Sequence, residues 1–149
     1  MEGIYARESP YLERYVQLGV ASERLLSVSF PTDADADDDN ELLDRVFAYL
    51  EGVEDDFRDV NVALTVPTAQ RAVLESVRDI PYGEQTTVET LAATSAGLDP
   101  DEPSDLDAVR TALAGNPAPL VIPDHRVRDG PSAAPPEVEQ RLRSLEGIR

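Results

Sequence analysis

The stretch AGNPAPLVIPDHRV, residues 114–127, runs from the end of a helix through a buried segment into three ionisable side chains. The Gly-Asn-Pro triplet at 115–117 ends the helix, because glycine and asparagine tolerate the backbone conformation after a last turn and proline cannot continue it. The aliphatic residues 120–122 predict a short strand of the core. Asp, His and Arg follow at 124–126, and this histidine is the only one in the chain. The end of the predicted strand is therefore the first candidate for a functional site.

On both sides of this stretch, apolar residues recur with helical spacing. The predicted helices cover residues 69–79, a short segment after residue 86, residues 104–114 and residues 136–147, with Thr68, Thr86 (paired with Glu89) and Ser104 as N-caps. Pro81 stops the first helix. The second and third helices are joined by the acidic, proline-rich loop 97–105, and this pair predicts a helix-turn-helix.

The first part of the chain predicts β structure and one helix. Residues 15–20 and 25–30 are two apolar runs that predict a hairpin, although the turn between them has no glycine. Asn40 caps a predicted helix that ends before Gly52. Residues 60–66 predict a further strand.

The charge of the chain is strongly negative. Its 149 residues carry a net charge of −17, and each of the 13 basic side chains is an arginine. An acidic load of this size repels itself at low ionic strength, whereas molar salt shortens the screening length to about 3 Å. We therefore expect a salt-rich cytoplasm, such as that of halophilic archaea, with an ordinary acidic protein as the alternative. General attraction to DNA phosphates is not expected, because it requires basic groups.

Cysteine is absent, which excludes disulfides, thiolate metal sites and thiol nucleophiles. A single histidine disfavours a transition-metal site, and the acidic run 32–40 lacks the glycine and the distal glutamate of a calcium loop. We therefore expect no metal and no cofactor. The first residues lack the pattern of a secretory signal, and no apolar run approaches the roughly 18 residues of a membrane span. We expect a cytoplasmic monomer without membrane contact.

Three motifs follow one another in the order found in a known family. IPYGEQTTVETLA (80–92), the stretch 114–127 and the closing LEG (145–147) resemble the alkylguanine-DNA alkyltransferases, which are DNA-repair proteins that move an alkyl group from guanine onto their own cysteine. The resemblance covers roughly residues 69–147, and several short motifs carry it.

The resemblance implies an α+β fold with two lobes. A small ribonuclease-H-like β-sheet lobe with a helix is expected over residues 1–66. A mostly helical lobe with a winged-helix-like helix-turn-helix is expected over residues 67–149. The strands and helices predicted above fit this layout.

The resemblance also places the family's reactive groups on this sequence. The acceptor cysteine falls on Asp124, the activating relay on His125 and Glu146, and the hinge asparagine on Asn116. A carboxylate is a far poorer soft nucleophile than a thiolate, and an alkylated aspartate is an ester open to hydrolysis. Asp124 and His125 are expected on an extended segment, where adjacent side chains point in opposite directions and rarely cooperate. We therefore expect a member that does not transfer alkyl groups.

The positions that contact DNA in this family are substituted as well. Val88 replaces the tyrosine that rotates the lesion, and Asp107 replaces the arginine that fills the gap left by the flipped base. Arg110 lies about one turn further on and is a possible substitute. The loop that walls the base pocket becomes residues 132–136, without glycine, and Glu139 replaces a lysine. Because base flipping costs a few kcal/mol that such contacts must offset, each substitution weakens it.

Two further residues near the expected pocket, Arg126 and Tyr82, are interpreted as structural. Arg126 can bond around the strand end and neutralise carboxylates close to Asp124. Glu146 can accept a water-mediated bond from His125, as the family's glutamate does.

Three functional hypotheses remain open. The first is a pseudoenzyme that keeps the fold as a scaffold for a protein partner or a small molecule. The second is a cysteine-free alkyltransferase-like sensor, which binds alkylated guanine in DNA, weakly and with salt dependence, and recruits repair factors. The third is a hydrolase that uses Asp124 and His125 as an acid–base pair.

Overall fold

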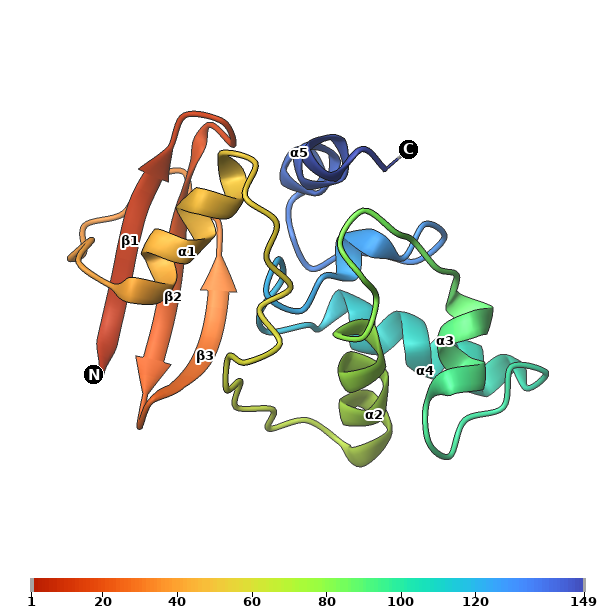
Figure 1. The fold of residues 1–149 in the computed structure, drawn as a ribbon. Coiled ribbons are helices and arrows are strands. Elements are labelled where there is room, and N and C mark those ends of the chain that lie inside the picture. Colours follow the sequence, from red (N-terminus) through yellow and green to blue (C-terminus); the bar gives the residue numbers. More distant parts are fainter. Residues whose placement is uncertain (1, 149) are drawn as a thin grey trace.

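The computed structural model describes residues 2–148. Its N-terminal part is an antiparallel sheet of order β1-β2-β3, formed by β1 (Gly3–Ser9), β2 (Arg14–Ala21) and β3 (Arg24–Ser29) (Figure 1). The predicted hairpin is confirmed as β2 and β3, and Ser22 and Glu23 in its turn have φ angles of 53° and 62°. A tight hairpin turn requires such positive angles, which glycine usually supplies.

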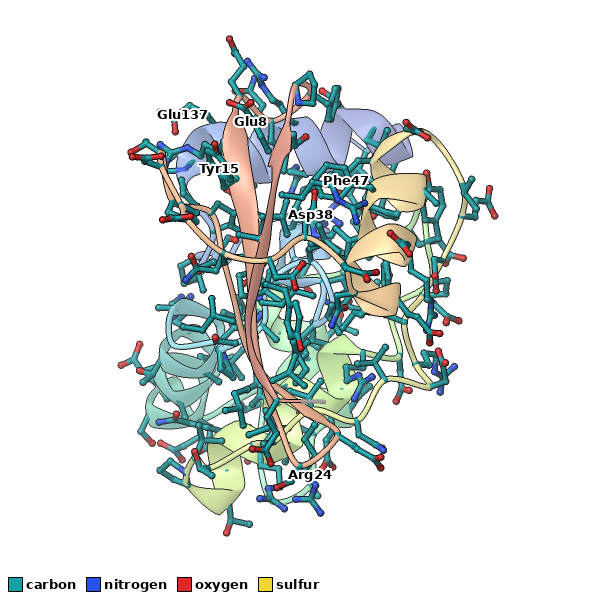
Figure 2. All side chains as sticks on the ribbon, turned by 90° about the vertical axis from the view of Figure 1, so that its left-hand side faces the viewer. Glu8, Tyr15, Arg24, Asp38, Phe47 and Glu137 are labelled. Atoms are coloured by element: carbon teal, nitrogen blue, oxygen red, sulfur yellow. The ribbon has the colours of Figure 1, made fainter. Side chains whose placement is uncertain are left out.

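Strand β1 is absent from the sequence-based expectation, because its apolar residues do not alternate regularly. Arg7 on this strand stacks its guanidinium over the Phe47 ring of helix α1 (Glu41–Leu50) at 4.9 Å. Helix α1 lies along one face of the sheet (Figures 1 and 2). Asn40 caps this helix as predicted, since its side chain accepts the N–H of Leu43 at 3.0 Å.

The strand predicted at residues 60–66 is wrong. Leu25 exchanges only two backbone hydrogen bonds with residues 61–63, at 2.8 and 2.9 Å, which makes an isolated bridge. Further along the same edge, the N–H of Val28 donates to the carbonyl of Pro117. The segment around Pro117 therefore occupies the edge of β3 along which a strand at residues 60–66 would have to continue.

Four helices form the C-terminal part: α2 (Thr68–Val77), α3 (Val88–Thr94), α4 (Pro103–Ala114) and α5 (Pro136–Glu146). They confirm the predicted helical regions, but the N-caps of the first three are Pro67, Thr87 and Glu102 instead of Thr68, Thr86 and Ser104. Thr86 cannot cap α3, because its backbone N–H and carbonyl pair with residues 126 and 128 at 2.8 and 3.0 Å.

The strand predicted at residues 120–122 is also wrong. Leu120 has a φ of 81°, and the N–H of Ile122 donates to the carbonyl of Ala118 at 2.8 Å, so the segment is a tight turn. Prolines before and after it cannot donate to a strand ladder. The apolar side chains of this run are nevertheless fully buried, which is what the sequence pattern reports.

One hydrophobic cluster includes residues of the sheet, of α1 and of the C-terminal helices, among them Leu18, Val46, Leu91 and Leu142. The mixed α and β composition is confirmed as a three-stranded sheet with five helices. The boundary at residues 66/67 and the ribonuclease-H-like and winged-helix-like descriptions stay predictions. Among residues 2–148, no helix is both long enough and apolar enough to cross a membrane.

Candidate functional site

Residues Asp124–Arg126 form one turn of 3-10 helix instead of the expected extended segment. The carbonyl of Pro123 accepts the N–H of Arg126 at 3.0 Å and closes this turn. The three side chains are buried, with exposed fractions of 1, 0 and 2%. Within the described chain, Asp124 and His125 form no hydrogen bond with each other. The expectation that Asp124 and His125 do not cooperate was argued from an extended segment, and that argument was wrong because the segment is a helical turn.

The Asp124 carboxylate is held by three donors. Its Oδ1 accepts the Ser132 hydroxyl at 2.6 Å, and its Oδ2 accepts the N–H of Ala133 at 2.9 Å and the side-chain amide of Asn116 at 3.0 Å. No arginine pairs with Asp124 in the described chain. Arg126, which was expected to neutralise carboxylates in this region, pairs with Glu146. Asp124 is thus a buried carboxyl group held by three uncharged donors.

Asn116 does more than end helix α4. Its side-chain amide also donates to the carbonyl of Ile122 at 2.9 Å, and its Oδ1 accepts the N–H of Ala118 at 3.0 Å. It therefore fixes the turn that leads to Asp124, a role that the sequence analysis did not assign.

His125 and Glu146 are in direct contact, and the expected bridging water is not needed. His125 Nε2 donates to Glu146 Oε2 at 2.7 Å, and the Tyr49 hydroxyl donates to the same oxygen. The other ring nitrogen, His125 Nδ1, has no hydrogen-bond partner in the described structure. Tyr49 comes from α1, so the N-terminal part contributes to this network, which the sequence analysis missed.

Arg126 pairs with the same glutamate. Its Nε donates to Glu146 Oε1 at 2.8 Å, and its Nη2 donates to Oε2 at 3.0 Å. Its Nη1 donates to the carbonyl of Ile80 at 2.7 Å, and its guanidinium lies 5.7 Å from the centre of the Tyr82 ring. The N–H of Gly83 completes the shell of Glu146 at 3.0 Å. These bonds are consistent with the structural interpretation of Arg126 and Tyr82.

The two buried carboxylates have opposite pKa shifts. Burial raises the pKa of Glu146, but bonds from His125, Arg126 and Tyr49 outweigh burial and hold this pKa well below its ordinary value. Burial raises the pKa of Asp124 above its ordinary value, and its three hydrogen bonds offset the effect only in part. Burial and the Glu146 charge also raise the pKa of Tyr49, which stays protonated as a donor.

The resemblance assigns DNA contacts to the positions of Val88 and Asp107, and that assignment stays a prediction. Val88 is 1% exposed and packs inside, with its N–H donating to Asp129 Oδ1 at 2.7 Å. Arg110 pairs with Asp107 on the exposed side of α4 at 3.3 Å. Whether Arg110 substitutes for the arginine that the resemblance places at Asp107 stays a prediction.

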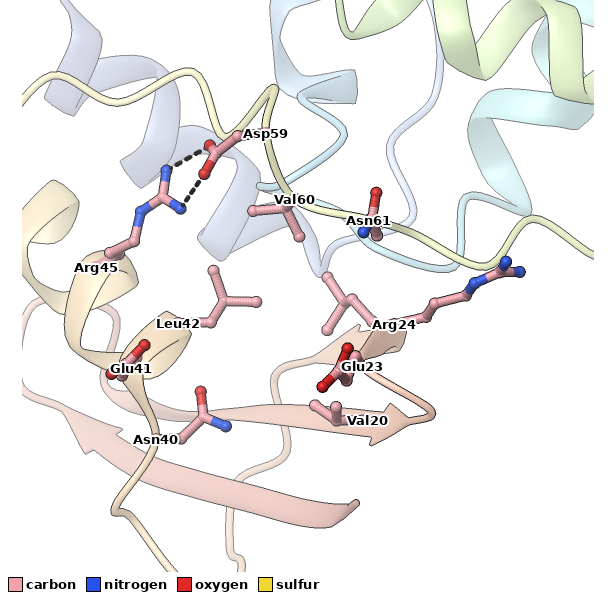
Figure 3. A pocket seen from close by; sticks show the side chains of 11 residues that line it. Val20, Glu23, Arg24, Asn40, Glu41, Leu42, Arg45, Asp59, Val60 and Asn61 are labelled. Atoms are coloured by element: carbon pink, nitrogen blue, oxygen red, sulfur yellow. Dashed lines mark hydrogen bonds and ion pairs between the residues drawn. The ribbon is translucent and has the colours of Figure 1, made fainter. Parts of the chain in front are cut away.

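Asp124 is not among the residues that line the hollows found on the described part of the chain. The cavity in Figure 3, of about 440 Å³, lies between the β2–β3 turn, the start of α1 and residues 59–61. A second hollow, of about 510 Å³, lies along α5 beside Glu139 and Arg143. Burial and the Asp124 charge raise the pKa of Glu139. No group of three metal-ligating side chains occurs among the described residues.

Comparison with known proteins agrees with the motifs. The family model described as 6-O-methylguanine DNA methyltransferase, DNA binding domain, matches residues 68–147. The methylated-DNA–protein-cysteine methyltransferase of Methanothermobacter thermautotrophicus is 36% identical over 114 residues, which cover 72% of this chain and 60% of that protein. The matched part therefore spans less than two thirds of this relative.

Solved structures share the fold. The O6-methylguanine-DNA methyltransferase of the archaeon Pyrococcus kodakaraensis superposes with a TM-score of 0.74 at 22% identity, covering 98% of this chain and 100% of that chain. The Mycobacterium tuberculosis protein in complex with DNA gives a TM-score of 0.73 at 22% identity, covering 97% and 90%. The chain, which has no cysteine, belongs to the 6-O-methylguanine DNA methyltransferase family.

Proposed function

We propose that this chain is a non-catalytic member of its family, a pseudoenzyme that keeps the fold as a scaffold. The observation that carries this proposal is Asp124, a buried carboxylate with both oxygens occupied by donors. The curated relatives are named for transfer to a cysteine, and this chain has none. A buried carboxyl group whose two oxygens already accept three hydrogen bonds is a weak nucleophile toward an alkyl carbon.

Incubation with a duplex that carries O6-methylguanine tests this proposal. We expect the intact mass of the protein to stay unchanged, while a cysteine-containing relative gains one methyl group under the same conditions. The experiment is run at the salt concentration where circular dichroism shows the folded state. A stable methyl adduct on Asp124, located by peptide mass spectrometry, would refute the proposal.

Among the partners considered for this scaffold, DNA has the most direct support, because the matched family model is a DNA-binding domain. The net charge of −17 and the Asp107–Arg110 pair oppose tight binding. We expect weak affinity and no preference for the lesion. Fluorescence anisotropy with matched lesion and unmodified duplexes measures both, and a clear preference for the lesion would favour the sensor hypothesis instead.

The hydrolase hypothesis receives no support from the geometry. His125 is fully buried and donates to Glu146, and Asp124 has no contact with it through a hydrogen bond. Neither side chain is among the residues that line the hollows described above.

A further inference from the structure

The segment 130–135 is fixed at both ends. At Gly130, an added Cβ would lie 2.6 Å from Leu113 Cδ1, so the backbone is pressed against helix α4. At the other end, Pro136 begins helix α5. Between these points the segment crosses Asp124, which is 1% exposed.

The middle of this segment is held by a single side chain. In the described part of the chain, the hydrogen bonds that Ser132 and Ala133 make outside the segment both end on the Asp124 carboxylate. The remaining bond, from the N–H of Ala134 to the Ser132 hydroxyl, is internal. Asn116 donates to the same carboxylate from the opposite side.

We propose that the Asp124 carboxylate is a latch, which keeps segment 130–135 closed over position 124. This inference rests on the proposed function and deepens it. Asp124, which replaces the reactive cysteine, would also hold the segment that keeps ligands away from position 124. The carboxylate suits this role because it offers two acceptor oxygens to donors from two sides. Without it, two N–H groups and one hydroxyl lose their acceptor, and Ser132 and Ala133 keep none of the described hydrogen bonds that they make outside the segment.

Amide hydrogen exchange tests the latch in the full-length protein. Pro131 and Pro135 have no amide, so the signal of the segment comes from Gly130 and residues 132–134. In Asp124→Ala, we expect exchange at Ala133 to be on the order of tenfold faster than in the wild type. Unchanged exchange at Ala133 in this variant would overturn the proposal.

Asp124→Asn is the matched control. Its side-chain oxygen can still accept from Asn116 and Ala133, and its amide can donate to the Ser132 hydroxyl, which rotates to accept. We expect exchange within about twofold of the wild type. Exchange as fast as in Asp124→Ala would show that the two acceptor positions of side chain 124 do not hold the segment, and would also overturn the proposal.

Ser132→Ala keeps the test valid where Asp124→Ala does not fold, because it changes only a surface loop. One of the two bonds of the segment then remains, and an intermediate increase at Ala133 is expected. No increase there would contradict the latch. Methyl transfer from a lesion duplex is measured separately, so a failed latch and a failed pseudoenzyme proposal give different results.

Discussion

Replacing Glu146 by glutamine tests what stabilises the buried network. The carboxylate accepts bonds from Gly83 N–H at 3.0 Å, His125 Nε2 at 2.7 Å, Arg126 Nε and Nη2 at 2.8 and 3.0 Å, and the Tyr49 hydroxyl. Glutamine keeps the size but removes the charge. Its side-chain NH2 group replaces one accepting oxygen and would face the N–H and O–H donors that surround Glu146. Breaking a buried ion pair from one side costs about 3–5 kcal/mol, and we expect Glu146→Gln to lower the free energy of unfolding by that amount.

Urea unfolding followed by circular dichroism measures this loss at a fixed, high KCl concentration. Glu137→Gln on the same helix is the control, because its contact with Arg14 is long, at 3.6 Å, and exposed. We expect this control to change the free energy of unfolding by less than about 0.5 kcal/mol. A loss below about 1 kcal/mol in Glu146→Gln would refute the reasoning, because it would mean that the Arg126 charge is solvated or paired elsewhere.

Three further predictions concern pH, salt and chemistry. The folded-state pKa of Glu146 lies below its ordinary value of 4.5, so its stabilising contribution is present above that pH and is lost as pH falls through the folded pKa. Urea midpoints of the wild type should therefore fall more steeply on acidification than those of Glu146→Gln; parallel curves would contradict this. The Tm should rise by several degrees between low salt and about 2 M KCl, because screening relieves the repulsion of a chain with net charge −17, and a Tm independent of KCl would argue against salt adaptation. Asp124→Cys should gain no methyl group from a lesion duplex, because the resemblance places Val88 and Asp107 at the positions of the groups that flip the base; a methylated cysteine found by mass spectrometry would show that this assignment is wrong or that those groups are dispensable.

Local sequence signals predicted most of the fold. Amphipathic spacing indicated the helices, and the cap at Asn40 was placed correctly because its side chain acts within one turn. The errors at residues 60–66 and 120–122 have a different origin. An apolar run reports burial, and both runs are largely buried or half-buried, but whether they join a sheet depends on which segment reaches the free edge of β3.

The site was predictable only in part. The resemblance linked His125 to Glu146 through a water, whereas the structure pairs them directly, and the pairing of Arg126 with Glu146 was not predicted. Tyr49 had a usable signal, because it lies three residues after Val46 on the apolar face of α1 and is 1% exposed. For Ser132 the resemblance placed the loop 132–136 beside the expected pocket, but its bond to Asp124 depends on the exact path of that loop, which local pattern does not determine.

The two buried carboxylates explain how this chain keeps the family's fold without its acceptor cysteine. Glu146 is neutralised by a cation, so its loss leaves a buried charge and should cost much of the stability. Asp124 is held by neutral donors, so an uncharged acceptor can take its place. In the described chain, the Glu146 network shares no hydrogen bond with Asp124, so we expect substitutions at position 124 to lower the free energy of unfolding less than substitutions at position 146.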